Sequence, residues 1–233
     1  MDSVVICKDV KKVFKQGEIE VHALTDIDLE IQRGDFVCMS GPSGSGKSTL
    51  LNVIGGLDKP TSGEITVDGK RVDQMEKSDL ANMRLHNIGF VFQAYNLIPV
   101  LTAQENVEMV MQMQGVHKHE RKEKSYAILK EVGLEGLETR KPPELSGGQQ
   151  QRVAVARAIV AKPSIVLADE PTANLDSVTA NNLLDLMLQM NEEHGTTFVI
   201  STHDPMIMQR AKRLVKLHDG CVVSNTAQNG GIS

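Results

Sequence analysis

The residues GPSGSGKSTLL, Gly41 to Leu51, combine three glycines, a lysine and several hydroxyl side chains directly before an apolar run. Glycine inside a regular element costs roughly 0.5–1 kcal/mol relative to alanine, so this much glycine needs a compensating role. The pattern fits G-x-x-x-x-G-K-[ST], follows an apparent strand and opens a helix, which is the context that a phosphate-binding loop requires. A glycine-rich turn with a chance lysine is the ordinary alternative, and the flanking elements disfavour it.

This loop predicts a site for the phosphates of a nucleoside triphosphate. Its glycines let backbone N–H groups converge on phosphate oxygens, and the helix N-terminus adds partial positive charge. We expect Lys47 to reach the β- and γ-phosphates and Ser48 to bind Mg²⁺ through its hydroxyl. The predicted nucleotide-binding residues of the loop are Gly41, Pro42, Ser43, Gly44, Ser45, Gly46, Lys47, Ser48 and Thr49.

Two acidic candidates follow a predicted buried strand. The stretch SIVLADE, residues 164–170, is a short apolar run bounded by loops, typical of a parallel strand buried on both faces. Consecutive strand side chains point to opposite sides, but at a strand end both can approach a site. We assign Asp169 to the Mg²⁺ shell and Glu170 as the base that polarises an attacking water. A solvated strand end is the alternative, which the phosphate loop makes less attractive.

The order of predicted elements indicates an α/β fold. The first ninety residues hold β-like runs at Val4–Phe14, Val21–Ile31, Asp35–Ser40 and Glu64–Val67. From Thr102, which has capping-box spacing to a glutamate, the pattern is helical to about residue 160. Strands alternate with helices afterwards, as in a parallel sheet. We expect a helical lobe over about 94–160 inserted into the core, and a flexible tail over 226–233.

The composition excludes several classes of protein. The net charge of −5 lacks the basic excess of a protein that coats nucleic acid, so we expect no nucleic-acid partner. No apolar segment approaches the ~20 residues that span a bilayer, and we expect no secretion signal at the N-terminus. The three cysteines are far apart, which favours reduced thiols over a disulfide framework or a zinc site. Any membrane role therefore requires another chain.

The stretch ELSGGQQQR, residues 144–152, is a second glycine motif at a helix start. Ser146 and Gln149 have the spacing of a capping box, which is the simpler interpretation. That interpretation does not explain Gly147 and Gly148 in the first turn, where alanine is better by up to roughly 1 kcal/mol each. Exposed backbone at a helix N-terminus is typical of an anion site. Two phosphate-facing elements in one chain suggest that two subunits share each nucleotide.

The motifs GPSGSGKS, LSGGQ and VLADEPT together resemble the ATP-binding subunit of an ABC transporter, over about Val4 to Val223. The resemblance implies a P-loop NTPase core with a parallel sheet, an N-terminal antiparallel β subdomain and an inserted α-helical subdomain. It implies one ATPase domain over 1–225, with the core and β subdomain in 1–93 and 161–225. The stretches IGGLDKPTSGEI and LADEPTANLDS are most similar to lipoprotein-releasing and macrolide-export ATPases.

The resemblance also implies roles for residues that spacing alone does not single out. Gln93 matches the loop glutamine between core and helical lobe, which serves catalysis and the metal shell, and His203 matches the switch histidine near the γ-phosphate. Phe14 matches the aromatic residue that stacks on adenine, and Asn174 and Asp176 match the loop that crosses the dimer interface. The implied catalytic residues are Lys47, Gln93, Glu170 and His203, the metal ligands are Ser48, Gln93 and Asp169, and the second copy's nucleotide is bound by Ser146, Gly147, Gly148 and Gln149.

The family implies an ATPase that uses ATP and Mg²⁺ and closes as a head-to-tail homodimer over two nucleotides. Its other partners would be integral membrane permease subunits, which place it at the cytoplasmic face of the membrane. A cell-division ATPase, or a soluble ABC ATPase of DNA repair or translation, is the alternative. The long coiled coils or second ATPase unit of such soluble relatives do not occur in this sequence. A nucleotide-binding regulator without turnover is disfavoured by Glu170.

Overall fold

In the computed structural model, which describes residues 2–17 and 19–228, two β-sheets form the frame of the fold. An antiparallel sheet has the order β2-β1-β4-β5. The second sheet has the order β10-β9-β3-β8-β7-β6, in which only the β10–β9 pairing is antiparallel. The antiparallel sheet consists of β1 (Ser3–Gln16), β2 (Ile19–Gln32), β4 (Ser62–Val67) and β5 (Lys70–Arg71).

The second sheet is the α/β core and is covered on both faces. Its strands are β3 (Phe36–Ser40), β6 (Ile88–Phe92), β7 (Ile165–Asp169), β8 (Phe198–Thr202), β9 (Arg213–His218) and β10 (Cys221–Ala227). In β3, Phe36 and Cys38 belong to the hydrophobic cluster on one face, while Val37 and Met39 belong to the cluster on the other. All four side chains are fully buried, as expected for a parallel strand between two layers.

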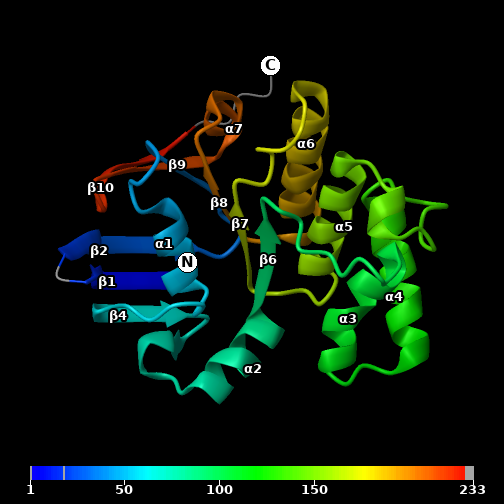
Figure 1. Cartoon of the computed structure of the whole chain (residues 1–233), viewed down its shortest axis with the longest axis horizontal. Coiled ribbons are helices and arrows are strands. Elements are labelled where there is room, and N and C mark those ends of the chain that lie inside the picture. The colour runs from blue at the N-terminus through cyan, green and yellow to red at the C-terminus, as the bar shows by residue number, and fades with distance from the viewer. Residues whose placement is uncertain (1, 18, 229–233) are drawn as a thin grey trace.

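The helices divide between these two faces (Figure 1). They are α1 (Lys47–Ile54), α2 (Lys77–Asn87), α3 (Ala103–Met113), α4 (Lys118–Glu131), α5 (Gly147–Ile159), α6 (Ser177–His194) and α7 (Pro205–Arg210), with 3-10 turns at Val72–Gln74 and Pro142–Glu144. Helix α1 and the antiparallel sheet pack on one face of the core sheet, and α5 and α6 pack on the other. Helices α3, α4 and α5 gather on the side of the molecule away from the antiparallel sheet. They follow β6 and precede β7, so the helical lobe is an insertion between two core strands.

Side-chain caps fix where several helices begin. The predicted capping box at Thr102 is confirmed, because Thr102 and Glu105 each bond the other's backbone N–H at the start of α3. Asp176 caps α6 by accepting hydrogen bonds from two backbone N–H groups. At the other end of α6, Gly195 adopts a left-handed φ of 63°, as expected for a helix C-terminus.

The predicted fold class is confirmed, but α2, α7 and the strands β5, β6, β9 and β10 were not predicted from the sequence. The expected flexible tail also needs correction. Thr226 and Ala227 belong to β10 and pair with Leu214 and Arg213, and the Gln228 N–H donates to the Lys212 carbonyl at 2.8 Å. Pairing with β9 therefore holds the chain to Ala227, and the bond to Lys212, just before β9, holds Gln228. The rest of the predicted tail, residues 229–233, lies outside the described residues.

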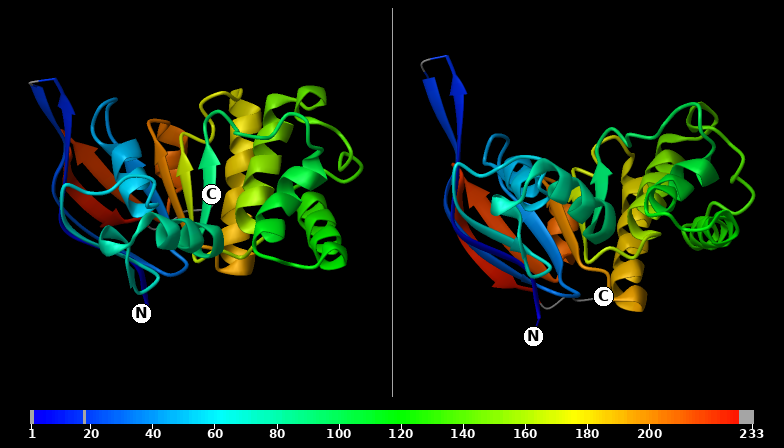
Figure 2. Two further views of the ribbon diagram at one scale, coloured as in Figure 1. Left: turned by 60° about the horizontal axis from the view of Figure 1, so that its bottom comes forward. Right: turned by 90° about the horizontal axis from the view of Figure 1, so that it is seen from below.

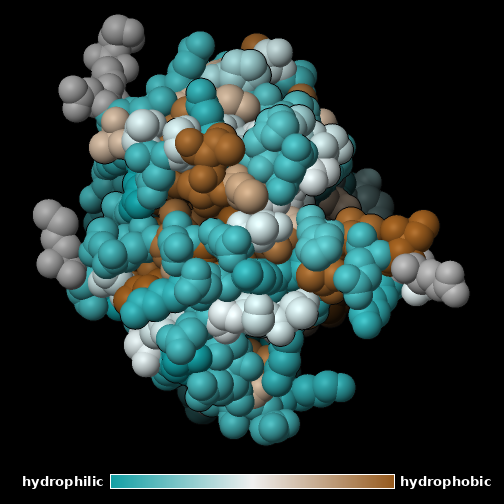
Figure 3. Space-filling model, turned by 90° about the vertical axis from the view of Figure 1, so that its left-hand side faces the viewer, coloured by the Kyte–Doolittle hydropathy of each residue, from teal (hydrophilic) through white to brown (hydrophobic). Residues whose placement is uncertain are grey.

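The surface is mostly hydrophilic on the face seen in Figure 3, with small hydrophobic areas between the polar ones. Figure 2 shows the β1–β2 hairpin projecting beyond the body of the molecule. Exposed apolar side chains include Ile19 and Val21 of β2 and Val223 of β10. Within residues 2–17 and 19–228, no helix has the length and apolar character needed to cross a membrane.

Candidate nucleotide site

The phosphate loop folds as a tight turn that leads from β3 into α1. Gly41 has a φ of 154°, and a Cβ at this position would lie 2.2 Å from the Leu217 carbonyl oxygen. Gly46 precedes the helix with a φ of 99°, and its Cβ would lie 2.6 Å from the Ala23 carbonyl oxygen. Both neighbours are backbone atoms that cannot turn aside, so only glycine fits. Because no side chain caps α1, the N–H groups of its first turn remain available to an anion.

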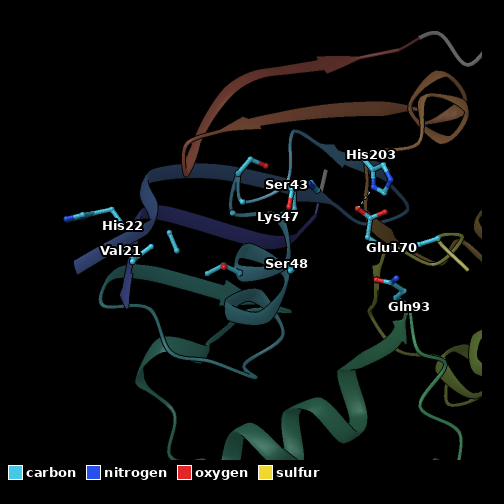
Figure 4. Close-up of a pocket in the computed structure, with 14 residues that line it drawn as sticks. Val21, His22, Ser43, Lys47, Ser48, Gln93, Glu170 and His203 are labelled. Atoms are coloured by element: carbon cyan, nitrogen blue, oxygen red, sulfur yellow. Dashed lines mark hydrogen bonds and ion pairs between the residues drawn. The ribbon is translucent and has the colours of Figure 1, made fainter. Parts of the chain in front are cut away.

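A cavity of about 580 Å³ opens over this loop (Figure 4). Lys47 lies in its wall, only 8% exposed, and its ammonium donates to the Gly41 and Pro42 carbonyls at 2.8 and 3.1 Å. The Ser45 hydroxyl oxygen is buried and has no hydrogen-bond partner among the described residues. An unpaired buried hydroxyl beside an uncapped helix start and a lysine suits the phosphate oxygens of a nucleotide.

The end of β7 approaches the loop from the opposite side. The Asp169 carboxylate accepts hydrogen bonds from the Ser48 hydroxyl at 2.9 Å and from the Ser201 hydroxyl. The structure thus brings the predicted metal ligands Ser48 and Asp169 together. A carboxylate and a hydroxyl are the oxygen ligands that Mg²⁺ prefers, so this pair fits the metal by its chemistry.

Glu170 owes its position to an unusual backbone conformation. Its φ is 46°, in the left-handed region that a non-glycine residue rarely adopts, and its N–H donates to the Ser201 carbonyl at 3.0 Å. Glu170 lines the cavity after this turn at the strand end, whereas Asp169 does not line it and instead contacts Ser48 and Ser201. The Glu170 Oε1 lies 2.9 Å from His203 Nδ1, and their side chains are 17% and 72% exposed. A carboxylate beside an exposed imidazole is therefore present at the cavity wall.

Gln93 completes this side of the cavity, just after β6. Its carbonyl accepts a hydrogen bond from Asn174 Nδ2 at 2.9 Å, and its side-chain amide lies 3.5 Å from Asn174 Oδ1. The predicted catalytic residues Lys47, Gln93, Glu170 and His203 thus line one cavity, although they come from four separate segments.

The sequence analysis missed part of the cavity wall. Val21, His22 and Ala23 of β2 line it on the hairpin side, and Ala173 lines it beside Glu170. Phe14, predicted to stack on adenine, pairs with Val21 in the hairpin but does not itself line the cavity. Its ring is 38% exposed, and the Lys12 ammonium lies 4.8 Å from the ring centroid. Residues of β2 reach the cavity through the register between β1 and β2, which pairs Phe14 with Val21, and no local sequence signal indicates that register.

The second glycine motif lies outside this cavity. Ser146 and Gln149 form the capping box: the Ser146 Oγ accepts from the Gln149 N–H at 3.3 Å and Gln149 Oε1 accepts from the Ser146 N–H at 2.9 Å. The glycines have a packing role as well. A Cβ on Gly147 would lie 2.8 Å from the Tyr95 hydroxyl, and one on Gly148 would lie 2.4 Å from the Thr179 methyl group. Close packing thus explains both glycines without an anion.

Asp176, predicted at a dimer interface, serves within this chain as the cap of α6. Its carboxylate accepts from the Val178 N–H, the Thr179 N–H and, at 2.6 Å, the Thr179 hydroxyl. These hydrogen bonds, led by that of the Thr179 hydroxyl, lower the pKa of Asp176. Through Thr179, the start of α6 lies against the start of α5.

Comparison with known proteins identifies the family to which this site belongs. The family model "ABC transporter" matches residues 24–173. The chain is 48% identical over 206 residues to the ABC transporter ATP-binding protein YtrE of Bacillus subtilis, which covers 88% of this chain and 89% of YtrE. This chain belongs to the ABC transporter ATP-binding family. It is an ABC ATPase, the ATP-binding motor of an ABC transporter.

Two further relatives confirm the predicted resemblance to ATP-binding subunits of ABC transporters. The macrolide export ATP-binding/permease protein MacB of Mannheimia succiniciproducens is 43% identical over 227 residues, which cover 97% of this chain but only 35% of MacB. The cassette MJ0796, a protein of Methanocaldococcus jannaschii, has been solved as a dimer in a post-hydrolysis state bound to ADP and Pi. It matches this fold with a TM-score of 0.89 at 44% identity and covers 97% of this chain and 100% of that structure.

Proposed function

We propose that two copies of this chain close head-to-tail over two ATP molecules and that hydrolysis reopens them. One observation carries the proposal: the phosphate loop and the catalytic candidates line one cavity, whereas Ser146–Gln149 lie outside it. The α5 start can therefore contact a nucleotide only when another copy presents one. The dimeric MJ0796 cassette supports this arrangement.

Within one copy, the predicted site residues have distinct tasks. The backbone N–H groups of Gly44–Thr49 and the Lys47 ammonium bind the phosphates and oppose their charge. Glu170 accepts a proton from the attacking water, and His203 at 2.9 Å orients that carboxylate and reaches toward the γ-phosphate. Phe14, beside Val21 on the hairpin, offers an aromatic face to the adenine. Asn174 holds the Gln93 backbone, which places the Gln93 amide at the same wall.

The residues also fit a magnesium ion. Ser48 and Asp169 already share a hydrogen bond, and they would hold Mg²⁺ together with Gln93 and the nucleotide. When bound, Mg²⁺ neutralises charge that develops on the phosphate oxygens. Asn174 and Asp176 would meet the second copy at the loop between β7 and α6.

We further propose that the dimer drives integral membrane permease subunits from the cytoplasmic face of a membrane. The work would be of the lipoprotein-release or macrolide- and peptide-export type. The similarity to MacB, whose name joins an ATP-binding part and a permease part, supports this class. The match covers 35% of the length of MacB.

Affinity purification from detergent-solubilised membranes tests the membrane role. The bait is Glu170→Gln with ATP and Mg²⁺, and the control is Lys47→Ala, which should not trap nucleotide. We expect an integral membrane protein in stoichiometric amount with the first bait. Recovery of ribosomes or DNA, with no integral membrane protein, would contradict the proposal and favour a soluble ABC ATPase.

A further inference from the structure

The two residues that follow Gln93 and Ala94 have an uncommon backbone. Tyr95 and Asn96 have φ values of 59° and 48°, so two successive non-glycine residues are left-handed. Asparagine tolerates this region, but tyrosine does so rarely. A conformation of this kind persists only where the surrounding structure imposes it. The contacts that impose it come from α5.

Arg157, in the last turn of α5, holds this segment. Its side chain is buried, and its guanidinium donates through Nη1 to the Asn96 carbonyl at 2.5 Å and through Nη2 to the Tyr95 carbonyl at 2.9 Å. The fork of a guanidinium suits two carbonyls side by side. Among the described residues no carboxylate forms an ion pair with Arg157, and burial lowers its pKa. A buried cation is costly without a partner, so these two carbonyls define its role.

The same segment also contacts the first turn of α5. The Tyr95 hydroxyl occupies the space beside Gly147, where a Cβ would lie 2.8 Å from its oxygen. Tyr95 thus touches α5 near both ends, through its carbonyl at Arg157 and through its hydroxyl at Gly147. The segment after Gln93 is therefore fastened along the helix that begins at Ser146.

We propose that Arg157 is a positioning residue that ties the Gln93 segment to α5, so that Gln93 and the Ser146–Gln149 helix start move as one unit. When Gln93 approaches the nucleotide of its own copy, α5 carries the same displacement to the surface that meets the other copy. Arg157 touches neither nucleotide and acts only through these two elements. The inference rests on the proposed role of Gln93 at the cavity.

Arg152 provides a matched control on the same helix. Its guanidinium Nη1 donates to the Val132 carbonyl at 2.8 Å, so Arg152→Met removes a comparable bond within the helical lobe. The test compares Arg157→Met and Arg152→Met in the full chain, with the ATP turnover rate, the KM for ATP and amide hydrogen exchange of residues 94–98 as readouts. We expect Arg157→Met to lower kcat about 10-fold or more with KM within about 2-fold, because the phosphate loop is intact. Exchange of residues 94–98 should rise about 10-fold only in that variant.

Equal kcat losses in the two variants, or unchanged exchange of residues 94–98 in Arg157→Met, would overturn the inference. Gln93→Ala separates it from the proposed function. If Gln93→Ala keeps wild-type turnover while Arg157→Met loses it and exchanges faster at residues 94–98, the proposed role of Gln93 is wrong, and only the tie between the Tyr95–Asn96 segment and α5 is supported.

Asn96 provides a second route should Arg157→Met fail to fold. This residue is exposed, so its substitution leaves the core intact. Asn96→Gly retains access to the left-handed region, whereas Asn96→Val opposes it. We expect Asn96→Val to lower kcat several-fold at unchanged KM and Asn96→Gly to stay within about 2-fold of wild type. Equal turnover in these two variants would contradict the inference.

Discussion

The helices α1 and α5 both begin at a glycine motif, but they use their free N–H groups differently. Helix α1 starts after the left-handed Gly46, has no side-chain cap and opens on the 580 Å³ cavity. Helix α5 starts after Ser146, which caps its own first turn, and it lies outside that cavity. One start is built for a ligand within the chain, whereas the other is satisfied by the chain itself.

The glycines of the two motifs differ in the same sense. Gly41 and Gly46 face backbone atoms and have a positive φ, whereas Gly147 and Gly148 face side chains and do not. The first pair is required by the shape of the loop, and the second by the neighbours Tyr95 and Thr179. A glycine-rich helix start is therefore not by itself a phosphate site. We therefore expect α5 to bind a nucleotide only in the presence of another copy.

The largest expected loss of ATP turnover comes from a substitution at the start of α1. Lys47→Ala removes the ammonium of the phosphate loop and should lower ATP turnover by about 10²-fold or more, as expected when a group that opposes developing charge is lost. Phosphate release under saturating ATP measures it. Lys59→Ala is the control, because Lys59 also donates to a carbonyl, that of Met75, but on the surface. Wild-type turnover in Lys47→Ala would contradict the assignment of residues 41–49 as a phosphate-binding loop.

A smaller but specific effect is expected at α5. Ser146→Arg places a bulky cation at the proposed contact between copies, so it should lower turnover by about 10-fold or more while nucleotide binding to the monomer stays unchanged. Fluorescent nucleotide titration and phosphate release measure the two quantities. Thr102→Arg is the control, since it destroys an equivalent capping box and costs about 1 kcal/mol of stability without touching the site. Loss of turnover in both variants to the same extent would mean that only the cap matters.

Gly148 and Gly41 should differ in whether a second substitution restores the stability that is lost when the glycine is replaced by alanine. Gly148→Ala should destabilise the fold by about 1–3 kcal/mol through contact with the Thr179 methyl group. Thr179→Ser removes that methyl group and keeps the hydroxyl bond to Asp176, so the double variant should recover most of the loss. Gly41→Ala meets the Leu217 carbonyl and should have no such rescue. Urea denaturation measures all three, and a Gly148→Ala protein as stable as wild type would refute the packing explanation.

The smallest effect is spectroscopic. ADP added to the isotopically labelled protein should shift the amide resonances of Gly44–Thr49 and leave those of Gly147–Gln149 unchanged, because the second set is self-capped in one copy. Heteronuclear NMR titration measures both sets in one sample. Shifts of similar size at the two helix starts under monomeric conditions would contradict the claim that only the α1 start binds nucleotide within one copy.

Much of the cavity was predictable because its determinants are local. The spacing from Gly41 to Ser48 fixes a turn and a helix start, and the apolar run before Asp169 fixes a strand end. These features need no knowledge of distant contacts. The capping boxes at Thr102 and Ser146 were predictable for the same reason, since each involves residues three apart.

Features that depend on distant contacts were not predictable. Val21–Ala23 line the cavity because of the β1–β2 register, which contains several irregularities. Arg157 meets the Tyr95 carbonyl across 62 positions of the sequence, and no local pattern indicates that bond. The tail at Thr226 looked polar and frayed, but its backbone pairs with β9. Such contacts follow from packing, which sequence patterns do not specify.

The central claim, that the nucleotide site is completed by another copy, is tested most directly by the mass of Glu170→Gln in solution. Size-exclusion chromatography with light scattering is run with and without ATP and Mg²⁺, and repeated with Glu170→Gln combined with Ser146→Arg. We predict that Glu170→Gln is a monomer that becomes a dimer only with ATP, and that the double variant stays monomeric. A mass that ignores ATP, or a double variant that still dimerises, would contradict it.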